Sequence, residues 1–250
     1  SNRNGTSSVG AVTYNIAAAA DWNPAQAGNA DLTGNGVTVS NVQIPTITSA
    51  TYDASTGSLI VTGTNLVKAV GATNDITANK FTLTGEGGST YTLTDTSNVE
   101  ITSATQFTLT LSAADKAAIN QIINKNGASS TGGTTYNLAV ADDWNTVIGN
   151  TDISDAAGNG ITVGNVAVPT ITSATYNYSS NILTVTGTGF LKNSGATNDI
   201  DVSKLTFTGE GGATYTLTNA SDVEITSATE FSVTLSGADL INVEALLNNN

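Results

Sequence analysis

The strongest constraint in this sequence is an internal repeat. The word PTITSATY begins at Pro45 and returns at Pro169, and the word VEITSAT begins at Val99 and returns at Val223, in both cases 124 residues later. A repeat of this length is typical of a tandem array, in which each period folds into one unit and equivalent segments adopt equivalent structures. We therefore expect a repeating architecture with this period.

The repeat also includes the first and last residues of the sequence. The word TYN begins at Thr13 and returns at Thr135, so the interval there is 122 residues, and the second copy is two residues longer after its tryptophan. The last residue, Asn250, aligns with Asn126, near the place where the opening segment recurs. From this alignment, and from Ser1 in the first position, we expect the chain to be an excised or processed piece of a longer array.

Most of each period reads as short β-strands. Polar residues alternate with apolar or β-branched ones, and turn sequences such as DASTG and TGEGG separate the runs, the second of them predicting a β-hairpin. The exception begins at Ser112, where an N-cap serine, an acid at Asp115 and spaced isoleucines predict one short helix, with a copy from Ser236. The predicted class is all-β with one short helix in each period.

Two segments resemble a known family. VPTITSATYNYSSNILTVTGTGF, which begins at Val168, resembles the opening of an IPT/TIG-type immunoglobulin-like domain. YNLAVADDW followed by DAAGNGITV, from Tyr136 onward, is similar to the closing segment of bacterial immunoglobulin-like repeats in very large surface proteins. The resemblance implies tandem immunoglobulin-like β-sandwiches in extracellular stalks, adhesins or layer proteins at the cell surface. The helix departs from the simplest members of the family.

The resemblance divides the chain into three parts. Residues 1–43 are then the C-terminal strands of a preceding or neighbouring repeat, residues 44–167 are a complete repeat, and residues 168–250 are a repeat that lacks its final strands. A second frame cuts the chain at the linker-like stretch NGASSTGG and gives domains 1–126 and 127–250. Both frames stay open at the level of the sequence.

The first frame predicts the partners of the chain. Further copies of the same repeat complete residues 168–250, either in cis in a continuous array or in trans, head-to-tail, when residues 1–43 of a neighbouring subunit supply the absent strands. In either case the strand around Thr13 should find no complete partner sheet in residues 44–125 of its own chain. Pairing between those two segments would instead favour the second frame.

Charge and composition exclude several classes of function. The net charge of −13 repels phosphate backbones and favours divalent cations, so we expect no nucleic acid partner. The sequence contains no Cys, His or Met, which excludes disulfides, ordinary zinc sites and catalysis by His or Cys. The apolar runs are far shorter than a membrane-spanning helix, so we expect no membrane insertion in this segment. We expect that the protein is not an enzyme.

Acidic turns make calcium the cofactor that the sequence favours, because calcium prefers oxygen ligands. The main group lies in ADDWNTVIGNTDISDAAGNG, and its first copy keeps fewer acids. The word GATNDI, kept letter for letter from Gly71 and from Gly195, adds one aspartate in each copy. The candidate ligands are Asp142, Asp143, Asp152, Asp155, Asn159, Asp21, Asp31, Asp75 and Asp199. The alternative for each is a polar turn, because Asn and Asp side chains mimic backbone hydrogen bonds.

Two further sets of residues bear on function. Trp22 and Trp144 each follow an aspartate, and we expect both to fill a core seam, with stacking on a sugar ring as the alternative. Asn4, Asn177 and Asn219 head N-x-Ser/Thr sequons, which are compatible with glycosylation at an exposed surface.

The sequence leaves three functions open. The leading hypothesis is a structural, non-catalytic segment of a large extracellular bacterial surface protein, which forms an adhesin stalk or surface filament from tandem immunoglobulin-like domains. The first alternative is a self-assembling surface layer or sheath, which lateral contacts between chains would favour. The second is a glycan-binding module, which an exposed aromatic platform would favour.

Overall fold

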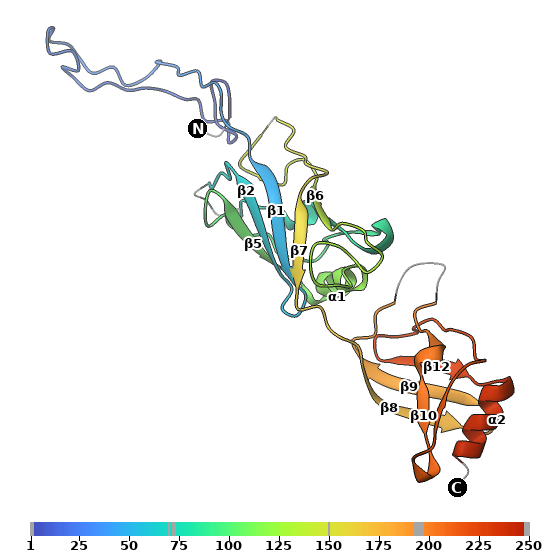
Figure 1. Cartoon of the computed structure of the whole chain (residues 1–250). Helices are drawn as coiled ribbons and strands as arrows, with labels where there is room; N and C mark the ends of the chain where they lie inside the picture. Colours follow the sequence, from blue (N-terminus) through green and yellow to red (C-terminus); the bar gives the residue numbers. More distant parts are fainter. Residues whose placement is uncertain (1–2, 70, 72–73, 150, 193–197, 248–250) are drawn as a thin grey trace.

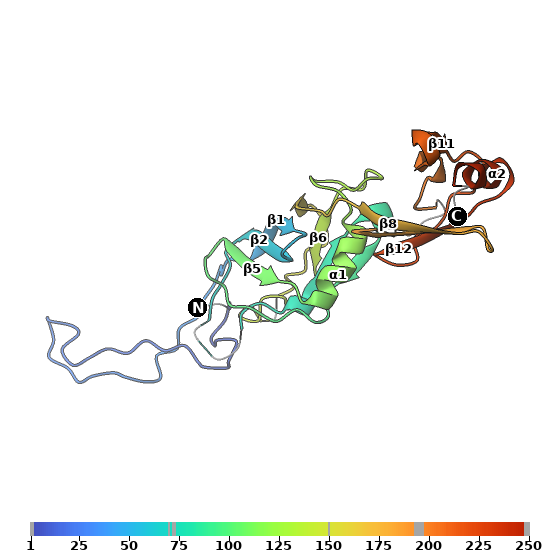
Figure 2. The same cartoon turned by 90° about the horizontal axis from the view of Figure 1, so that it is seen from below.

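The computed structural model is an extended molecule made of successive parts. It describes residues 3–69, 71, 74–149, 151–192 and 198–247. We name the parts the N-terminal ribbon (residues 4–42), the first body (45–125), the inner ribbon (126–166) and the second body (169–247). The N-terminal ribbon reaches out from one end of the first body, and the second body lies at the opposite end (Figures 1 and 2).

Strands make up most of the regular structure, so the all-β prediction is confirmed. The first body holds β1 (Thr46–Asp53), β2 (Ser58–Thr64), η1 (Ala78–Lys80), β3 (Phe81–Thr84), η2 (Glu86–Gly88), β4 (Thr90–Thr92), β5 (Gln106–Thr110) and α1 (Ala113–Ile122). The inner ribbon holds β6 (Asn137–Val140) and β7 (Gly160–Gly164). The second body holds β8 (Thr170–Asn177), β9 (Ile182–Thr188), η3 (Val202–Lys204), β10 (Thr206–Thr208), η4 (Glu210–Gly212), β11 (Thr214–Thr216), β12 (Glu230–Thr234) and α2 (Gly237–Leu246).

The helix predicted from Ser112 is confirmed. The Ser112 hydroxyl accepts a hydrogen bond from the backbone N–H of Asp115 at 3.0 Å, which satisfies one of the free donors at the start of α1. Ile119 is buried on the side of the helix that faces the core. The helix ends at Ile122, and Ile123 is its C-cap.

The two ribbon strands join the two halves of the first body into one sheet. Its strand order is β4-β3-β6-β7-β1-β2-β5, so β6 and β7 lie between β3 and β1. The β6 strand pairs antiparallel with β3, and β7 pairs parallel with β1. In the second body the corresponding strands form two separate sheets, of order β10-β11 and β12-β9-β8. The difference between the bodies is the pair of ribbon strands.

Within each body, equivalent strands pair in the same way. The β1–β2 hairpin has a register shift between Ile47 and Ser49, and the β8–β9 hairpin has the same shift between Ile171 and Ser173. The TGEGG words form the turns of the β3–β4 and β10–β11 hairpins, as the sequence predicts.

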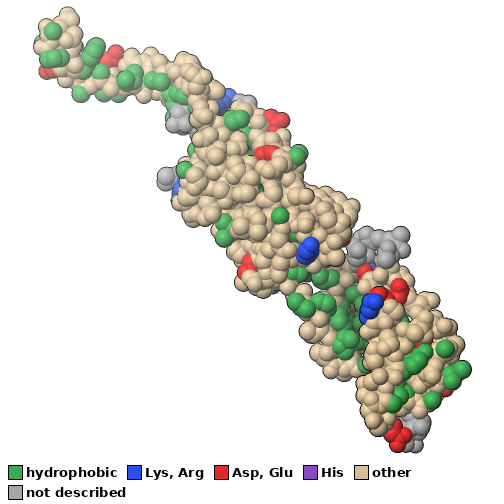
Figure 3. Space-filling model, viewed as in Figure 1, with side chains coloured by type: hydrophobic (Ala, Val, Ile, Leu, Met, Phe, Trp, Pro, Cys, Tyr) green, Lys and Arg blue, Asp and Glu red, His purple; other side chains and the backbone are tan. Residues whose placement is uncertain are grey.

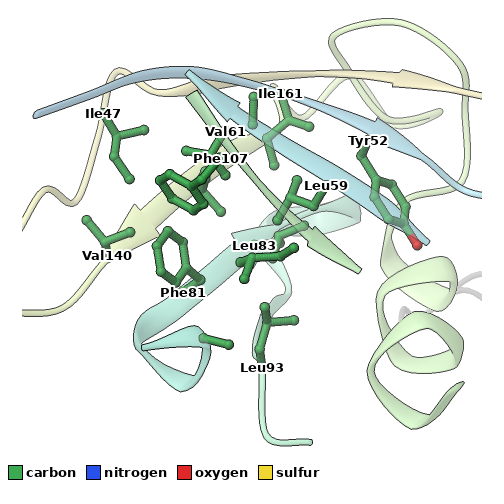
Figure 4. Close-up of a cluster of buried hydrophobic side chains, with 14 of the residues drawn as sticks. Ile47, Tyr52, Leu59, Val61, Phe81, Leu83, Leu93, Phe107, Val140 and Ile161 are labelled. Atoms are coloured by element: carbon green, nitrogen blue, oxygen red, sulfur yellow. The ribbon is translucent and has the colours of Figure 1, made fainter. Parts of the chain in front are cut away.

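The core of the first body is shared between body and ribbon. Phe81 of β3 packs edge-on against Phe107 of β5, with ring centroids 5.7 Å apart, so the sheet curls over a common interior. Val140 of β6 and Ile161 of β7 enter that interior from the ribbon (Figure 4). Burying one such aliphatic side chain stabilises a fold by roughly 1.5–3 kcal/mol. The ribbon is therefore a structural component of this core.

In the described part of the chain, the strand around Thr13 forms its backbone hydrogen bonds with other residues of the N-terminal ribbon. The N–H of Tyr14 donates to the carbonyl of Thr6 at 2.9 Å, and the N–H of Ile16 donates to the carbonyl of Asn35 at 3.0 Å. These partners belong to the ribbon, and none of these bonds reaches the described residues of the first body. No helix in the described part of the chain is long and apolar enough to cross a membrane.

Candidate functional site

The N-terminal ribbon has the same internal hydrogen-bonding pattern as the inner ribbon. Positions are equivalent at an interval of 122 residues in the first arm of the ribbon and 124 in the second. Backbone bridges join Gly5 to Val39, Ser7 to Thr13, Asn15 to Gly36 and Ala18 to Asp31, and equivalent bridges join Gly127 to Val163, Ser129 to Thr135, Asn137 to Gly160 and Val140 to Asp155. The N-terminal ribbon therefore holds the inner-ribbon conformation without a body around it.

An asparagine fixes each ribbon from within. The Nδ2 of Asn159 donates to the carbonyl of Leu138 at 3.1 Å, and the N–H of Asn159 donates to the Oδ1 of Asn137 at 3.1 Å. Asn35 makes the equivalent bonds, to the carbonyl of Ile16 at 3.1 Å and to the Oδ1 of Asn15 at 2.9 Å. The hydrogen bonds of these side chains hold the two arms of each ribbon together.

The two ribbons differ in what covers their apolar face. Trp144 and Leu138 of the inner ribbon are 0% exposed, whereas the equivalent Trp22 and Ile16 are 67% and 65% exposed. Figure 3 shows hydrophobic side chains along the outside of the N-terminal ribbon. The core role that the sequence predicts for both tryptophans is confirmed for Trp144. In this chain it is wrong for Trp22, because the described residues of the two bodies leave that side chain uncovered.

The second body exposes the apolar surface that the inner ribbon covers in the first body. Ile47 on β1 is 3% exposed beneath the inner ribbon, whereas the equivalent Ile171 on β8 is 57% exposed. Beside it lies a hollow of about 640 Å³. Its lining includes the apolar side chains of Phe190, Leu205 and Phe231, and on the side of the preceding repeat it includes Asn124 and Thr131. Figure 3 shows hydrophobic side chains gathered at the surface of this body. We call this surface, from β8 across the hollow to β10, the open groove.

The inner ribbon shows what an equivalent groove accommodates in the first body. The indole of Trp144 lies 6.1 Å from Phe81 and 6.2 Å from Phe107, measured between ring centroids, and its N–H donates to the carbonyl of Ile153 at 2.8 Å. Leu205 and Phe231, which line the hollow, are the equivalents of those two phenylalanines. The hollow therefore lies at the position that the Trp144 side chain fills in the first body.

Backbone edges accompany the apolar surface. In the first body the N–H of Ala141 donates to the carbonyl of Lys80 at 2.9 Å, and the N–H of Thr77 donates to the carbonyl of Trp144 at 2.9 Å. In the described part of the second body, β10 is paired only with β11, and β8 only with β9. Each of these strands therefore presents one edge of unpaired backbone groups, a template for an added strand.

The acidic residues proposed as calcium ligands are distributed among turns. Asp142 Oδ1 accepts from the N–H of Ile153 at 2.9 Å, and Asp152 Oδ1 accepts from the N–H of Ser154 at 2.9 Å. The hydrogen bonds from the Ser154 hydroxyl and from the Ser154 N–H lower the pKa of Asp152. Asp143 has a positive φ of 60°. Four further candidates lie in the two ribbons. Asn159 holds the inner ribbon together as described above, and Asp155 pairs through its backbone with Val140. In the N-terminal ribbon, Asp31 accepts from Asn35 and Asp21 accepts from Gly28.

The structure brings no set of three acidic side chains together at one point among the residues it describes. Calcium at these turns stays a prediction. What the geometry does show is that several of the candidate oxygens are used as acceptors for nearby backbone N–H groups. That is the alternative role that the sequence analysis assigned to them.

The aspartate of the GATNDI word is a buried anchor. Asp75 is buried, and its carboxylate accepts from the N–H of Ala69 at 2.8 Å and from the N–H of Ile101 at 3.1 Å. In the second copy Asp199 accepts from the N–H of Ile225 at 2.9 Å. A carboxylate that ties this loop to a segment about 26 residues later explains why this letter is kept. The letters at positions 72, 73 and 195–197 lie outside the described residues.

Sequence reasoning did not identify the most heavily bonded carboxylate, which is Asp115. It accepts from the N–H groups of Thr94, Asp95 and Thr96 and from the Tyr91 hydroxyl, at 2.8–3.0 Å. Burial raises the pKa of Asp115, but these hydrogen bonds lower it further, and the net pKa lies well below the usual range.

The equivalent Asp239 has the same environment. It accepts from the N–H groups of Thr218, Asn219 and Ala220, and against the opposing effect of burial these bonds lower its pKa to about 2. The available signal was that the same acid stands three residues after the N-cap serine position in both copies. That pattern was read as a helix-start signal only.

Comparisons with protein-family models, with curated proteins and with solved structures gave no match to this chain.

Proposed function

We propose that this chain is a structural, non-catalytic segment of a large extracellular bacterial surface protein. Tandem immunoglobulin-like β-sandwiches, each with one short helix, would form an adhesin stalk or a surface filament. The proposal rests on the internal repeat, the all-β fold and the family resemblance of the segments from Val168 and from Tyr136. The acidic surface and the absence of Cys, His and Met support a non-catalytic role.

The observation that carries the proposal is the path of the chain through the first body. The chain enters at the start of β1 and leaves at the end of β7, and these two strands are adjacent and parallel, with Ser49 opposite Gly160 and Asp53 opposite Gly164. Tension along the chain pulls these two strands in opposite directions along their common axis. All of the hydrogen bonds between them then share the load.

The end of this strand pair carries extra bonds. The N–H of Ala54 donates to the carbonyl of Gly164 at 3.0 Å, and the Nδ2 of Asn165 donates to the Oδ2 of Asp53 at 2.7 Å. Both contacts lie where the chain leaves the unit, so they reinforce the pair at a loaded end. This arrangement suits a unit that transmits force from one repeat to the next.

The open groove favours the surface layer or sheath as a second candidate, because an unfilled apolar surface with free strand edges suits contacts between chains. A glycan-binding module has weaker support. Its best feature is the exposed Trp22, and the equivalent Trp144 is a core residue in the first body.

Single-molecule pulling tests the proposal. Because the native chain contains no cysteine, handles can be attached through Cys variants at Ile44 and Ala167, which load β1 against β7 along their axis. The matched control attaches the handles at Thr46 and Thr64, which face each other at adjacent ends of the antiparallel β1–β2 pair, so that its bonds break one at a time. We expect the first geometry to need a severalfold higher unfolding force. Equal forces in the two directions would contradict a load-bearing role.

A further inference from the structure

We propose that the open groove of the second body binds the N-terminal ribbon of a second copy of this chain. The inference rests on the proposed function, since it names the partner of the same structural unit. It would join the chains head to tail, each copy donating its ribbon to the next. Such a contact uses two different surfaces of each copy, so it extends into a filament unless the geometry closes it.

The N-terminal ribbon is already ordered in the way that the inner ribbon is ordered in the first body. Its two arms are held by the same bridges that hold the inner ribbon in the first body, from Gly5–Val39 to Ala18–Asp31. A binding segment that is ordered before it binds loses little conformational entropy on binding. Over these bridged arms the N-terminal ribbon therefore holds the conformation that the inner ribbon has in the first body.

The apolar surfaces of the ribbon and the groove also match. Placed as the inner ribbon is placed in the first body, Trp22 enters the hollow between Leu205 and Phe231. Ile16 then faces Phe207, as Leu138 faces Leu83 in the first body. Each facing position remains apolar although the residues have changed. A buried tryptophan in a preformed pocket is the usual form of an energetic hot spot.

The backbone edges of the ribbon and the groove match as well. The first body pairs Thr82 with Ala139 and Thr51 with Thr162, so the equivalent pairs are Thr206 with Ala17 and Thr175 with Thr38 of the second copy. The inserted arms would lie between β10 and β8 and join the two separate sheets into one. The added strands would cover both free edges at once.

A hydrogen bond between the ribbon and a hairpin turn of the first body predicts the same alignment of ribbon and groove. In the first body Glu86 accepts from the N–H of Gly132 at 2.8 Å, and this bond ties the ribbon to the β3–β4 turn. Glu210 is the equivalent residue of the second body, and Gly10 is the equivalent of Gly132. The proposal therefore places the Gly10 N–H of one copy on the Glu210 carboxylate of the next.

The N-terminal ribbon of a chain cannot fill the groove of that same chain, because of the shape of the molecule. The N-terminal ribbon and the second body lie at opposite ends of the chain, with the first body between them (Figure 1). The groove of the first body is occupied by the inner ribbon. The free ribbon and the free groove of one chain therefore cannot meet each other, but those of two chains can.

Disulfide trapping tests this register directly. The variant A17C/T206C places one cysteine on the ribbon and one on β10, and a cross-link can form only if the pair comes within the Cα separation of about 4.4–6.8 Å that a disulfide requires. We expect a ladder of covalent dimers, trimers and longer chains on a non-reducing gel, which collapses to monomer on reduction. The variant A17C/T216C is the register control, because Thr216 lies on β11, on the far side of β10.

The matched positive control is T82C/A139C, whose two positions face each other within one chain and should give an intramolecular disulfide. A17C/T206C remaining monomeric while this control closes would overturn the proposal and leave a ribbon from a following repeat in the same polypeptide as the occupant. A ladder of equal yield from A17C/T216C would overturn it as well. Neither result would change the expected outcome of the pulling experiment, because that experiment depends only on the first body and its inner ribbon.

Tryptophan fluorescence gives a second readout that does not depend on disulfide geometry. Trp22 and Trp144 are the two tryptophans of the chain, and Trp144 is already buried. Raising the protein concentration should shift the emission to the blue as Trp22 enters the groove. The variant W22A should weaken self-association at least roughly 30-fold, the range expected for a hot spot. Emission that is independent of concentration, or unchanged association of W22A, would refute the proposal.

Discussion

Replacing Trp144 with alanine tests whether a ribbon supplies part of the core of its body. Trp144 has no exposed surface, packs against Phe81 and Phe107, and uses its indole N–H in a hydrogen bond to Ile153. Truncating a buried tryptophan leaves a cavity and costs about 3–5 kcal/mol. The matched variant is W22A, at the equivalent position of the N-terminal ribbon.

The expected difference between the two variants is large. For a unit of this size a loss of 3–5 kcal/mol lowers the melting temperature by roughly 10–20 °C. In dilute solution Trp22 is mostly exposed, and substitutions at such positions usually change stability by no more than about 0.5 kcal/mol. Both changes remove the same side chain from the same ribbon position, so composition and local propensity cancel in the comparison.

Differential scanning calorimetry measures both effects. We expect W144A to shift the transition of the first body downward and W22A to leave both transitions in place at low protein concentration. A loss below about 1 kcal/mol for W144A, well under the range for a buried tryptophan, would refute the reasoning that the ribbon completes the core. So would a W22A effect as large as that of W144A in the dilute chain.

Four further predictions concern the buried carboxyl groups and the acidic turns. Asp115→Asn should cost about 2–3 kcal/mol in urea unfolding, because an amide replaces a carboxylate that only accepts hydrogen bonds. Since the pKa values of Asp115 and Asp239 are lowered in the folded state, they stabilise the fold above pH 4, and that stability should be lost as the pH falls toward 2. A hydrogen bond with Asp75 raises the pKa of Glu100, so Glu100 favours the folded state below pH 4 and this stabilisation is lost as the pH rises. Glu100→Gln should therefore raise the melting temperature at pH 7 and have little effect below pH 4; an equal effect at both pH values would contradict the raised pKa of Glu100. Calcium binding to the acidic turns of residues 142–159 should raise the melting temperature and magnesium should do less, whereas identical curves in calcium and in a chelator would exclude a site.

The sequence predicted the local structure where a signal lies within a few residues. The helix from Ser112 and the hairpin at TGEGG depend on short-range patterns of caps, turns and alternation, and the structure contains both. The class of the fold followed from the same patterns. These signals are local because backbone hydrogen bonding in a helix turn or hairpin involves residues close together in the chain.

The sequence did not predict features that depend on distant partners. Asp115 looked like a helix-start acid, and only the fold shows that it accepts bonds from a loop about twenty residues earlier. Trp22 and Trp144 have the same local sequence context, yet one is exposed and the other buried, because burial depends on which body lies beside the ribbon. The acids proposed for calcium are close in sequence, but turns direct their side chains to separate backbone donors.

The structure of the assembled protein is the most direct test of the claim that one copy completes another. Electron cryo-microscopy of the concentrated chain should show a head-to-tail assembly in which the second body of each copy holds a ribbon between β8 and β10. We expect Ala17 of the neighbour opposite Thr206 and its Trp22 between Leu205 and Phe231. Isolated molecules with an empty groove at high concentration, or an assembly in which the ribbon lies elsewhere, would contradict the account.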